Sequence, residues 1–112
     1  MEQIIIINES GTIHQYKEHN SLLEFEIIIT EKLVSDFSII SGDVNPLHMD
    51  EKYAAKTKFK KRVCHGMLLS SFLSRLIGMY LPGRNALYFS QTLNFISPGF
   101  INDLITVKGK II

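Results

Sequence analysis

Three stretches of the chain alternate apolar and polar residues with a period of two, the pattern of a strand that has one face on a core. Their apolar faces consist of Leu23, Phe25, Ile27 and Ile29 in residues 22–29, Leu87, Phe89, Leu93 and Phe95 together with Gln91 in residues 87–95, and Ile105, Val107 and Ile111 in the last run. The run Ile4 to Ile7 lacks the alternation but is apolar enough for a short fourth strand. We therefore expect an antiparallel sheet.

The first strand is followed by helical patterns. After Thr30, a residue type that caps helix N-termini, apolar residues recur at helical intervals: Leu33, Val34, Phe37 and Ile40. This spacing predicts a short amphipathic helix to about Ile40 that ends at Ser41-Gly42. Asp50 is expected to cap a second, brief helix that runs through Ala55.

The most apolar segment, residues 66–80, is expected to form a helix that is buried on nearly all sides. Its apolar residues cover almost the whole circumference: Met67, Leu68, Leu69, Phe72, Leu73, Leu76, Ile77, Met79 and Tyr80. Small residues recur every four positions, so a neighbour should pack closely on that side: Gly66, Ser70, Ser74 and Gly78. Leu81-Pro82-Gly83 should end the helix, and Pro98-Gly99 should make a turn.

These elements fit one α+β domain over residues 1–112. A hydrophobic helix in the concave face of a twisted antiparallel sheet would bury both elements. The length of 112 residues and the hydrophobic content of 46% are typical of a single globular domain. No internal repeat or linker divides the sequence.

The composition excludes several classes of function. Twelve Lys and Arg against eleven Asp and Glu leave a net charge of +1, so no global field favours nucleic acid or a membrane surface. The single cysteine, Cys64, excludes an internal disulfide, and the Cys and His spacings of a thiolate metal site are absent. Without a secretory signal or a membrane-spanning run, we expect a cytoplasmic protein with no metal and no cofactor.

Asp43 and His48 are the first candidates for chemistry. They lie five positions apart in the stretch Ser41-Gly42-Asp43-Val44-Asn45-Pro46-Leu47-His48, which the glycine and the proline should keep irregular. A carboxylate and an imidazole on such a loop can converge on one small molecule as acid and base. The alternative is a plain turn, because Asp and Asn are common turn residues and a lone histidine is more often structural.

Gly66 is the second candidate, in the segment Val63-Cys64-His65-Gly66-Met67. It begins the long helix, so its amide lacks an intrahelical partner and could hydrogen-bond a carbonyl oxygen as charge develops there. The alternative is a glycine that only starts a helix. We interpret His65 as a structural hydrogen-bonding residue and Cys64 as a small buried one.

Four motifs together resemble those of the MaoC-type dehydratases and (R)-specific enoyl-CoA hydratases. They are Asp-x-Asn-Pro-Leu-His at residues 43–48, Tyr53-Ala54-Ala55, Val63-Cys64-His65-Gly66-Met67-Leu68 and Asn94-Phe95-Ile96-Ser97-Pro98. Their order and separations also match, over about residues 22–112. The first motif is specific, and its occurrence together with His-Gly-Met-Leu strengthens it.

The resemblance implies a hot-dog fold, in which the sheet wraps the helix of residues 66–80, and usually a homodimer. It implies (R)-specific hydration of trans-2-enoyl-CoA to (R)-3-hydroxyacyl-CoA, or the reverse dehydration, by Asp43 and His48 sharing one water. By the same resemblance Gly66 would polarise the thioester carbonyl, Ser74 would support the site and Asn45 would brace the loop. Which of Asp43 and His48 is acid and which is base stays open.

Two other functions stay open. One is a 3-hydroxyacyl dehydratase of the same fold that acts on acyl carrier protein, and the other is a non-catalytic domain that binds acyl thioesters or serves in assembly. A basic cluster could bind the phosphates of coenzyme A or an acidic carrier protein, or could be a solvated face: Lys58, Lys60, Lys61, Arg62 and Arg84.

This sequence departs from the pattern of the family at two places. Family domains usually continue with two further strands, so we expect a C-terminally truncated sheet unless Ile4 to Ile7 or a partner chain fills the gap. Asn102-Asp103 also stands where the family often has Gly-Asp. Asn tolerates the left-handed conformation, so this change should be mild.

Overall fold

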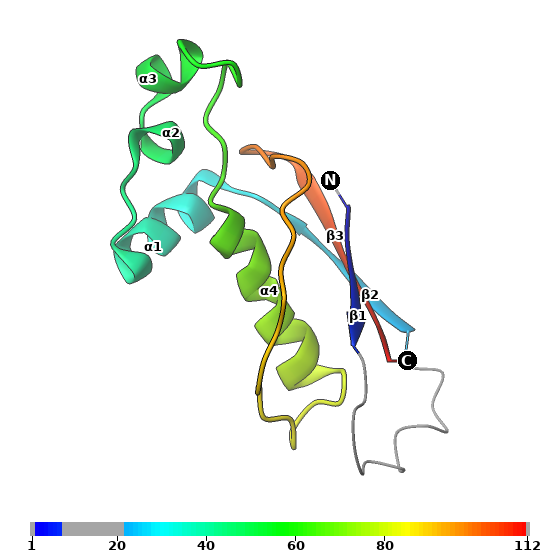
Figure 1. Cartoon of the computed structure of the whole chain (residues 1–112). Coiled ribbons are helices and arrows are strands. Elements are labelled where there is room, and N and C mark those ends of the chain that lie inside the picture. Colours follow the sequence, from blue (N-terminus) through cyan, green and yellow to red (C-terminus); the bar gives the residue numbers. More distant parts are fainter. Residues whose placement is uncertain (1, 8–21, 112) are drawn as a thin grey trace.

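The computed structural model describes residues 2–7 and 22–111. The elements follow in the order β1 (Glu2–Ile7), β2 (Leu22–Ile28), α1 (Glu31–Ser41), α2 (Pro46–Met49), α3 (Glu51–Ala55), α4 (Gly66–Met79) and β3 (Leu104–Ile111). In Figure 1, α4 lies beside the sheet, and α1, α2 and α3 gather beyond the N-terminal end of α4. The predicted α+β architecture, with one long helix on a sheet, is confirmed.

The sheet has three strands in the order β1-β3-β2. β2 and β3 are antiparallel, with Phe25 opposite Val107 and Ile27 opposite Ile105. β1 pairs with the other edge of β3 in parallel, so the expectation of an entirely antiparallel sheet is wrong for this pair. The run Ile4 to Ile7 does supply a strand, and its distance along the chain from β3 leaves it free to enter in either direction.

The alternation of β2 and β3 predicted their faces correctly. Ile105 and Val107 are fully buried, and Phe25 and Ile27 on the neighbouring strand are partly buried against the same core. On the opposite face the Lys108 ammonium lies 3.6 Å from the Glu24 carboxylate, across a register that places the two residues opposite each other. A one-residue slip would exchange these two faces, so burial fixes the register.

The core forms where α4 packs on β3. Leu68, Leu69, Leu73 and Leu76 of α4 are buried in one cluster with Ile105 and Val107. Gly109 lets the helix approach the strand closely, because a Cβ atom at this position would lie 2.5 Å from Leu76 Cδ2 and 3.1 Å from Leu81 Cδ1. This close approach is not on the side that the small residues of α4 predicted, because Gly78 has no heavy atom within 4 Å of an added Cβ and Ser74 is exposed.

Gly109→Ala is expected to lower the free energy of unfolding by about 1–3 kcal/mol, because the added methyl group overpacks the contact with α4. Gly78→Ala is the matched control: it lies in α4 with no heavy atom within 4 Å of the added Cβ. It should raise stability by about 0.4–1 kcal/mol, since alanine favours the helix. Urea unfolding measures both changes, and equal stabilities would contradict this view of the interface.

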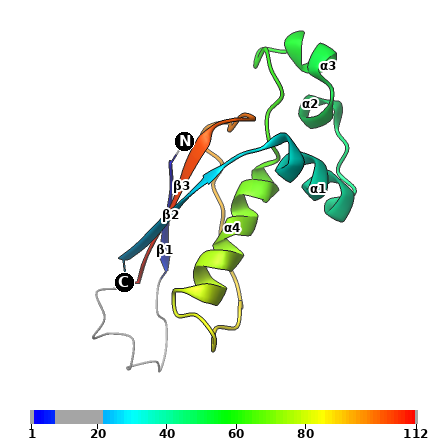
Figure 2. The ribbon, with the colours of Figure 1, turned by 180° about the vertical axis from the view of Figure 1, so that it is seen from behind.

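Residues 87–95 do not form the predicted strand. They run back along α4 toward β3 as an extended segment without strand hydrogen bonds (Figures 1 and 2), and Leu87 and Phe89 are 87% and 95% exposed. The alternation identified an apolar face correctly, but a strand also needs a neighbour for its backbone groups. The described part of the chain offers none there.

α4 is not enclosed on nearly all sides, which corrects the expectation of a wrapped helix. Its sheet-facing side is buried, whereas Met67 and Met79 are 54% and 68% exposed and Ser74 is exposed. The three-stranded sheet covers only one side of the helix (Figure 2). The described residues therefore cover only part of the apolar surface of α4, although its apolar residues surround the whole helix.

The helix boundaries follow the predicted caps. Thr30 Oγ1 accepts from the Leu33 amide at 3.1 Å, and Asp50 Oδ1 accepts from the Tyr53 amide at 3.0 Å. α1 ends at Ser41, followed by Gly42 with a left-handed φ of 76°. Asn102 has a φ of 75°, so it does adopt the left-handed conformation that was expected to be tolerated there. Among the described helices, none is both long and apolar enough to span a bilayer.

Candidate functional site

Asp43 lies on a loop in which side-chain oxygens accept hydrogen bonds from backbone amides two residues further along the chain. Its amide donates to Ser41 Oγ at 3.1 Å, and its own Oδ1 accepts from the Asn45 amide at 3.1 Å. Asn45 Oδ1 in turn accepts from the Leu47 amide at 2.9 Å. Each side chain satisfies a backbone group two residues away, a pattern typical of Asx-turns. The carboxylate of Asp43 is thereby oriented, with Oδ2 directed toward His48.

The sequence predicted that His48 lies on an irregular loop, but it lies on the short helix α2. The reason is Pro46, which occupies the first helical position, where its missing N–H costs nothing and its fixed φ suits the helix. Asn45 is the N-cap with φ −52° and ψ 130°, so the proline does exclude helical geometry from the residue before it. The irregular stretch is thus confined to residues 42–45.

The ring of His48 presents one nitrogen to Asp43. Nδ1 lies 2.6 Å from the carbonyl oxygen of Val63 and must donate to it, because a carbonyl only accepts. In the neutral ring Nε2 therefore carries the lone pair, and it lies 4.0 Å from Asp43 Oδ2. The side chains of His48 and Asp43 are 17% and 48% exposed, so solvent reaches this gap. Two acceptors facing each other across 4.0 Å can share one water molecule.

His65 joins these two residues from the start of α4. Its Nε2 lies 2.9 Å from the backbone oxygen of Asp43 and donates to it. Its ring lies against the ring of His48 in a tilted arrangement, with centroids 4.1 Å apart and planes 32° apart. The centroid of the Phe37 ring lies 4.9 Å from that of His65. His65 is 2% exposed, so the prediction that it is a structural hydrogen-bonding residue is confirmed.

Asp43, His48 and His65 were not predicted as a metal site, although their possible ligand atoms all lie within 4.8 Å of one another. A nitrogen that carries a hydrogen cannot bind a metal, and His65 Nε2 must keep its hydrogen to donate to Asp43. Nδ1 of His65 then carries the lone pair, but this atom is buried away from solvent. The accessible ligands are therefore Asp43 Oδ2 and His48 Nε2. Zinc sites use at least three protein ligands, so the cluster fits proton transfer better than metal binding.

Gly66 is the first residue of α4, as predicted. The side chain of His65, at the N-cap, makes no capping hydrogen bond, and the Gly66 amide has no acceptor among the described residues. The amide therefore stays available at the positive end of the helix dipole, next in sequence to the residue that contacts Asp43 and His48. A Cβ atom at Gly66 would lie 3.0–3.4 Å from three carbons of the Phe95 ring, so a larger residue would displace that ring.

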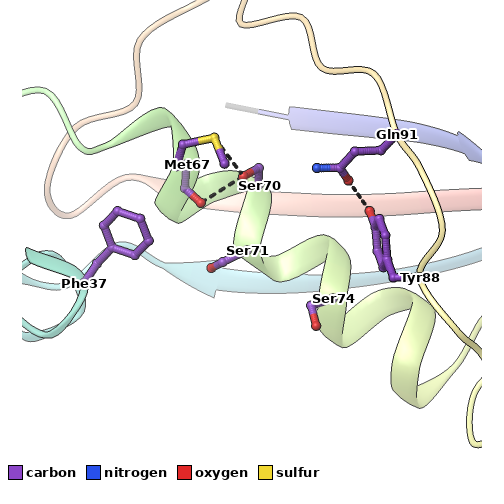
Figure 3. Close-up of a pocket in the computed structure, with 7 residues that line it drawn as sticks. All are labelled: Phe37, Met67, Ser70, Ser71, Ser74, Tyr88 and Gln91. Carbon is purple, nitrogen blue, oxygen red and sulfur yellow. Dashed lines mark hydrogen bonds between the residues drawn. The ribbon is translucent and has the colours of Figure 1, made fainter. Parts of the chain in front are cut away.

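An open groove of about 400 Å³ lies along the outer side of α4 (Figure 3). Residues from α1, α4 and the segment after α4 line it: Phe37, Met67, Ser70, Ser71, Ser74, Tyr88 and Gln91. Phe37 also contacts the ring of His65, so the groove begins beside the histidine cluster. Small residues on α4, among them Ser70 and Ser74, leave this space open, so no described residue packs closely on Ser74 as the spacing had predicted.

Ser74 lines the groove away from the Asp43–His48 pair. It follows Gly66 by two helical turns, about 12 Å along the axis, and its hydroxyl makes no hydrogen bond to a described residue. Phe37 and Tyr88 also line the groove, and neither was predicted to do so. Gln91 gave a usable signal, because it was the polar exception on an otherwise apolar face, and the Tyr88 hydroxyl donates to its Oε1 (Figure 3).

The predicted basic cluster divides into exposed and buried members. Lys58, Lys60 and Lys61 are exposed on the loop after α3, and the Lys61 ammonium lies 4.4 Å from the centroid of the Phe100 ring. Arg62 points inward and is 8% exposed. Arg84 follows the opposite end of α4, so the structure does not bring it to the three lysines.

Arg62 makes its hydrogen bonds to other residues of the chain. Its Nη1 donates to both carboxylate oxygens of Glu31 at 2.9 and 2.7 Å, and its Nε donates to the His48 backbone oxygen at 2.6 Å. The side chain thus ties the first turn of α1 to the helix that carries His48. Its structural role was not predicted.

Cys64 is a small buried residue, as predicted. Burial, followed by the nearby negative charge of Asp103, raises the pKa of its thiol to about 11. The thiol therefore stays protonated at neutral pH, which excludes a thiolate nucleophile at this position.

Comparison with known proteins gives a consistent result. The family model described as MaoC like domain matches residues 15–111. The chain is 42% identical over 78 residues to an (R)-specific enoyl-CoA hydratase of Aeromonas caviae, and 42% identical over 83 residues to a 3-hydroxybutyryl-CoA dehydratase of Methylorubrum extorquens. These alignments cover 70% and 74% of this chain but 58% and 53% of the relatives, so the chain spans little more than half their length.

The fold is shared with a solved structure, the (R)-hydratase of A. caviae described as involved in PHA biosynthesis. The TM-score is 0.78 at 38% sequence identity, over 82% of this chain and 70% of the other. The hot-dog fold that the sequence motifs implied is thereby confirmed.

Proposed function

Because this chain belongs to the MaoC-like domain family, we propose that it adds water to the double bond of a trans-2-enoyl thioester to give an (R)-3-hydroxyacyl thioester, and catalyses the reverse dehydration. The observation that carries the proposal is the Asp43–His48 pair. Both groups present an acceptor to the same gap, 4.0 Å across. Hydration needs a water that gives up a proton as its oxygen attacks, and this arrangement can bind one.

Asp43 and His48 can carry out every proton transfer that the proposed hydration requires. A water in the gap donates one hydrogen bond to Asp43 Oδ2 and one to His48 Nε2. Its oxygen bonds to the β-carbon while one member of the pair takes its proton, and the π electrons move toward the thioester oxygen. The pair then returns that proton to the α-carbon, which completes the hydroxyacyl product.

The Gly66 amide is proposed to stabilise the negative charge that develops on the thioester oxygen. Its position at the N-terminus of α4 adds the field of the helix dipole to the hydrogen bond. One such donor typically contributes about 2.7–4 kcal/mol to lowering the barrier. Gly66→Pro would remove this donor at a helix position that suits proline, but like any larger residue it would also displace the ring of Phe95.

We propose that the acyl chain lies in the groove along α4, past Ser70 and Ser74, with coenzyme A as its carrier. Apolar and small side chains fit such a chain, and Ser74 would stand beside it about two helical turns from Gly66. For the phosphates of coenzyme A the proposal is confined to Lys58, Lys60 and Lys61. Arg62 is buried on Glu31, and Arg84 follows the far end of α4.

The test is hydration of crotonyl-CoA by the purified chain, followed as loss of the enoyl-thioester absorbance. The same assay with crotonyl-acyl carrier protein separates the coenzyme A enzyme from the carrier-protein dehydratase, because exposed lysines could also meet an acidic carrier. A folded protein that is inert toward both thioesters would reject hydration and favour a non-catalytic binding or assembly role.

We also propose that the chain forms a homodimer and that it is cytoplasmic. The homodimer is supported by the exposed apolar side chains on residues 87–96, of which Leu87, Phe89 and Ile96 are 87%, 95% and 91% exposed. Light scattering that returns the mass of a single chain, 12.8 kDa, would exclude it. A cytoplasmic location fits the unpaired buried Cys64, and detection of the protein in a different cell fraction would exclude it.

A further inference from the structure

We propose that His65 is the positioning residue of the site: its Nε2–H fixes the backbone of Asp43 while its ring seats the ring of His48. This inference rests on the proposed hydration. His65 lies 22 residues from Asp43 in sequence, and the two are joined by a hydrogen bond of 2.9 Å. Its ring contacts His48 with centroids 4.1 Å apart. One buried side chain thus touches both members of the pair.

The segment that carries His65 holds the pair from both sides. The Val63 oxygen accepts from His48 Nδ1 at 2.6 Å, and two residues later His65 donates to Asp43. The segment is itself anchored, since Val63 bridges to Phe100 and the Cys64 amide donates to the Gly99 oxygen at 2.8 Å. The 4.0 Å gap therefore depends on one rigid stretch of backbone.

Packing alone does not explain a histidine at this position. Nδ1 of His65 is buried and has no hydrogen-bond partner among the described residues, which is unfavourable for a polar atom. An apolar ring would contact Phe37 and His48 equally well without that cost. What the imidazole adds is the Nε2–H that reaches Asp43. The side chain is thus better matched to holding the site than to stabilising the fold.

The experiment compares two side chains of similar length, His65→Gln and His65→Met. Glutamine keeps an N–H donor for the Asp43 oxygen, whereas methionine has none. With crotonyl-CoA, kcat is expected to fall about 10- to 100-fold in His65→Met, because a displaced acid-base group loses its alignment. His65→Gln should keep kcat within about threefold of wild type, the loss expected from its missing ring contact with His48. KM should change little in either variant, because neither side chain binds substrate.

His65→Phe supplies a second readout, since it keeps the stacked ring and removes both the donor and the unpartnered nitrogen. It is expected to unfold at a temperature no lower than that of wild type and yet to lose kcat to the same extent as His65→Met. Equal kcat in the glutamine and methionine variants would overturn the inference, as would losses of kcat that only follow losses of folded protein. An inactive wild-type chain would instead reject the proposed function itself.

Discussion

Asp43→Asn and His48→Gln are each expected to lower kcat for hydration of crotonyl-CoA by about 10²- to 10⁴-fold, the usual contribution of a positioned acid or base. Asparagine keeps an oxygen for the Asn45 amide, so the loop should stay in place while the proton acceptor is lost. Glutamine removes the nitrogen lone pair that faces Asp43 across 4.0 Å. Steady-state rates, with circular dichroism to confirm folding, measure both effects.

The two substitutions should not be additive. If the pair shares one water, the double variant is expected to be about as slow as either single variant, because each change already disables the unit. Asp50→Asn is the matched control, since Asp50 caps α3 through the Tyr53 amide and asparagine caps equally well. It should keep the wild-type rate. A single variant of the pair that hydrates as fast as wild type would show that its residue takes no part in the chemistry.

The parts of the site that the sequence predicted are local in the chain. Asp43, Asn45 and His48 lie within six residues, and Gly66 starts a helix whose apolar pattern marks its position. Turn chemistry and capping act over two or three residues, so they leave a signal in the sequence. Even there, the geometry had to come from the structure, because Pro46 places His48 on a helical turn.

The parts that the sequence did not predict depend on distant partners. Whether Arg62 joins its neighbouring lysines at the surface or turns inward is decided by Glu31, which lies 31 residues earlier. The contact of His65 with Asp43 likewise spans 22 residues. Charge patterns and motif spacing carry no information about such pairs until the elements are assembled.

The difference between local features and features that depend on distant partners also explains which strands were predicted. The strands β2 and β3 were predicted because their alternation reports burial of one face, and both found a hydrogen-bonding neighbour. Residues 87–95 show the same alternation, yet no described residue offers them a ladder. Periodicity predicts which face of a segment is apolar, whereas strand formation is a property of two segments.

The contact between Arg62 and Glu31 leads to the second large effect. The guanidinium side chain is 7% exposed, and the carboxylate accepts two of its hydrogen bonds, at 2.9 and 2.7 Å. Nη2 of the same group has no partner among the described residues. Removing Glu31 would leave a buried cation whose remaining hydrogen bond is to the His48 oxygen. A buried charge without its partner is more costly than the loss of the pair as a whole.

Glu31→Ala is therefore expected to lower the free energy of unfolding by about 2–3 kcal/mol, less than a fully buried pair would lose, because the Glu31 side chain is 60% exposed. Adding Arg62→Met should recover part of this loss, since the double variant no longer buries a cation. Glu51→Ala is the matched control at the first turn of α3, where the carboxylate has no ion pair among the described residues. Urea unfolding of wild type, Glu31→Ala, Glu51→Ala and the double variant measures these effects. If Glu31→Ala loses no more stability than Glu51→Ala, the ion pair does not hold α1 to the site. If the double variant is less stable than Glu31→Ala, the unpaired guanidinium is not the source of the loss.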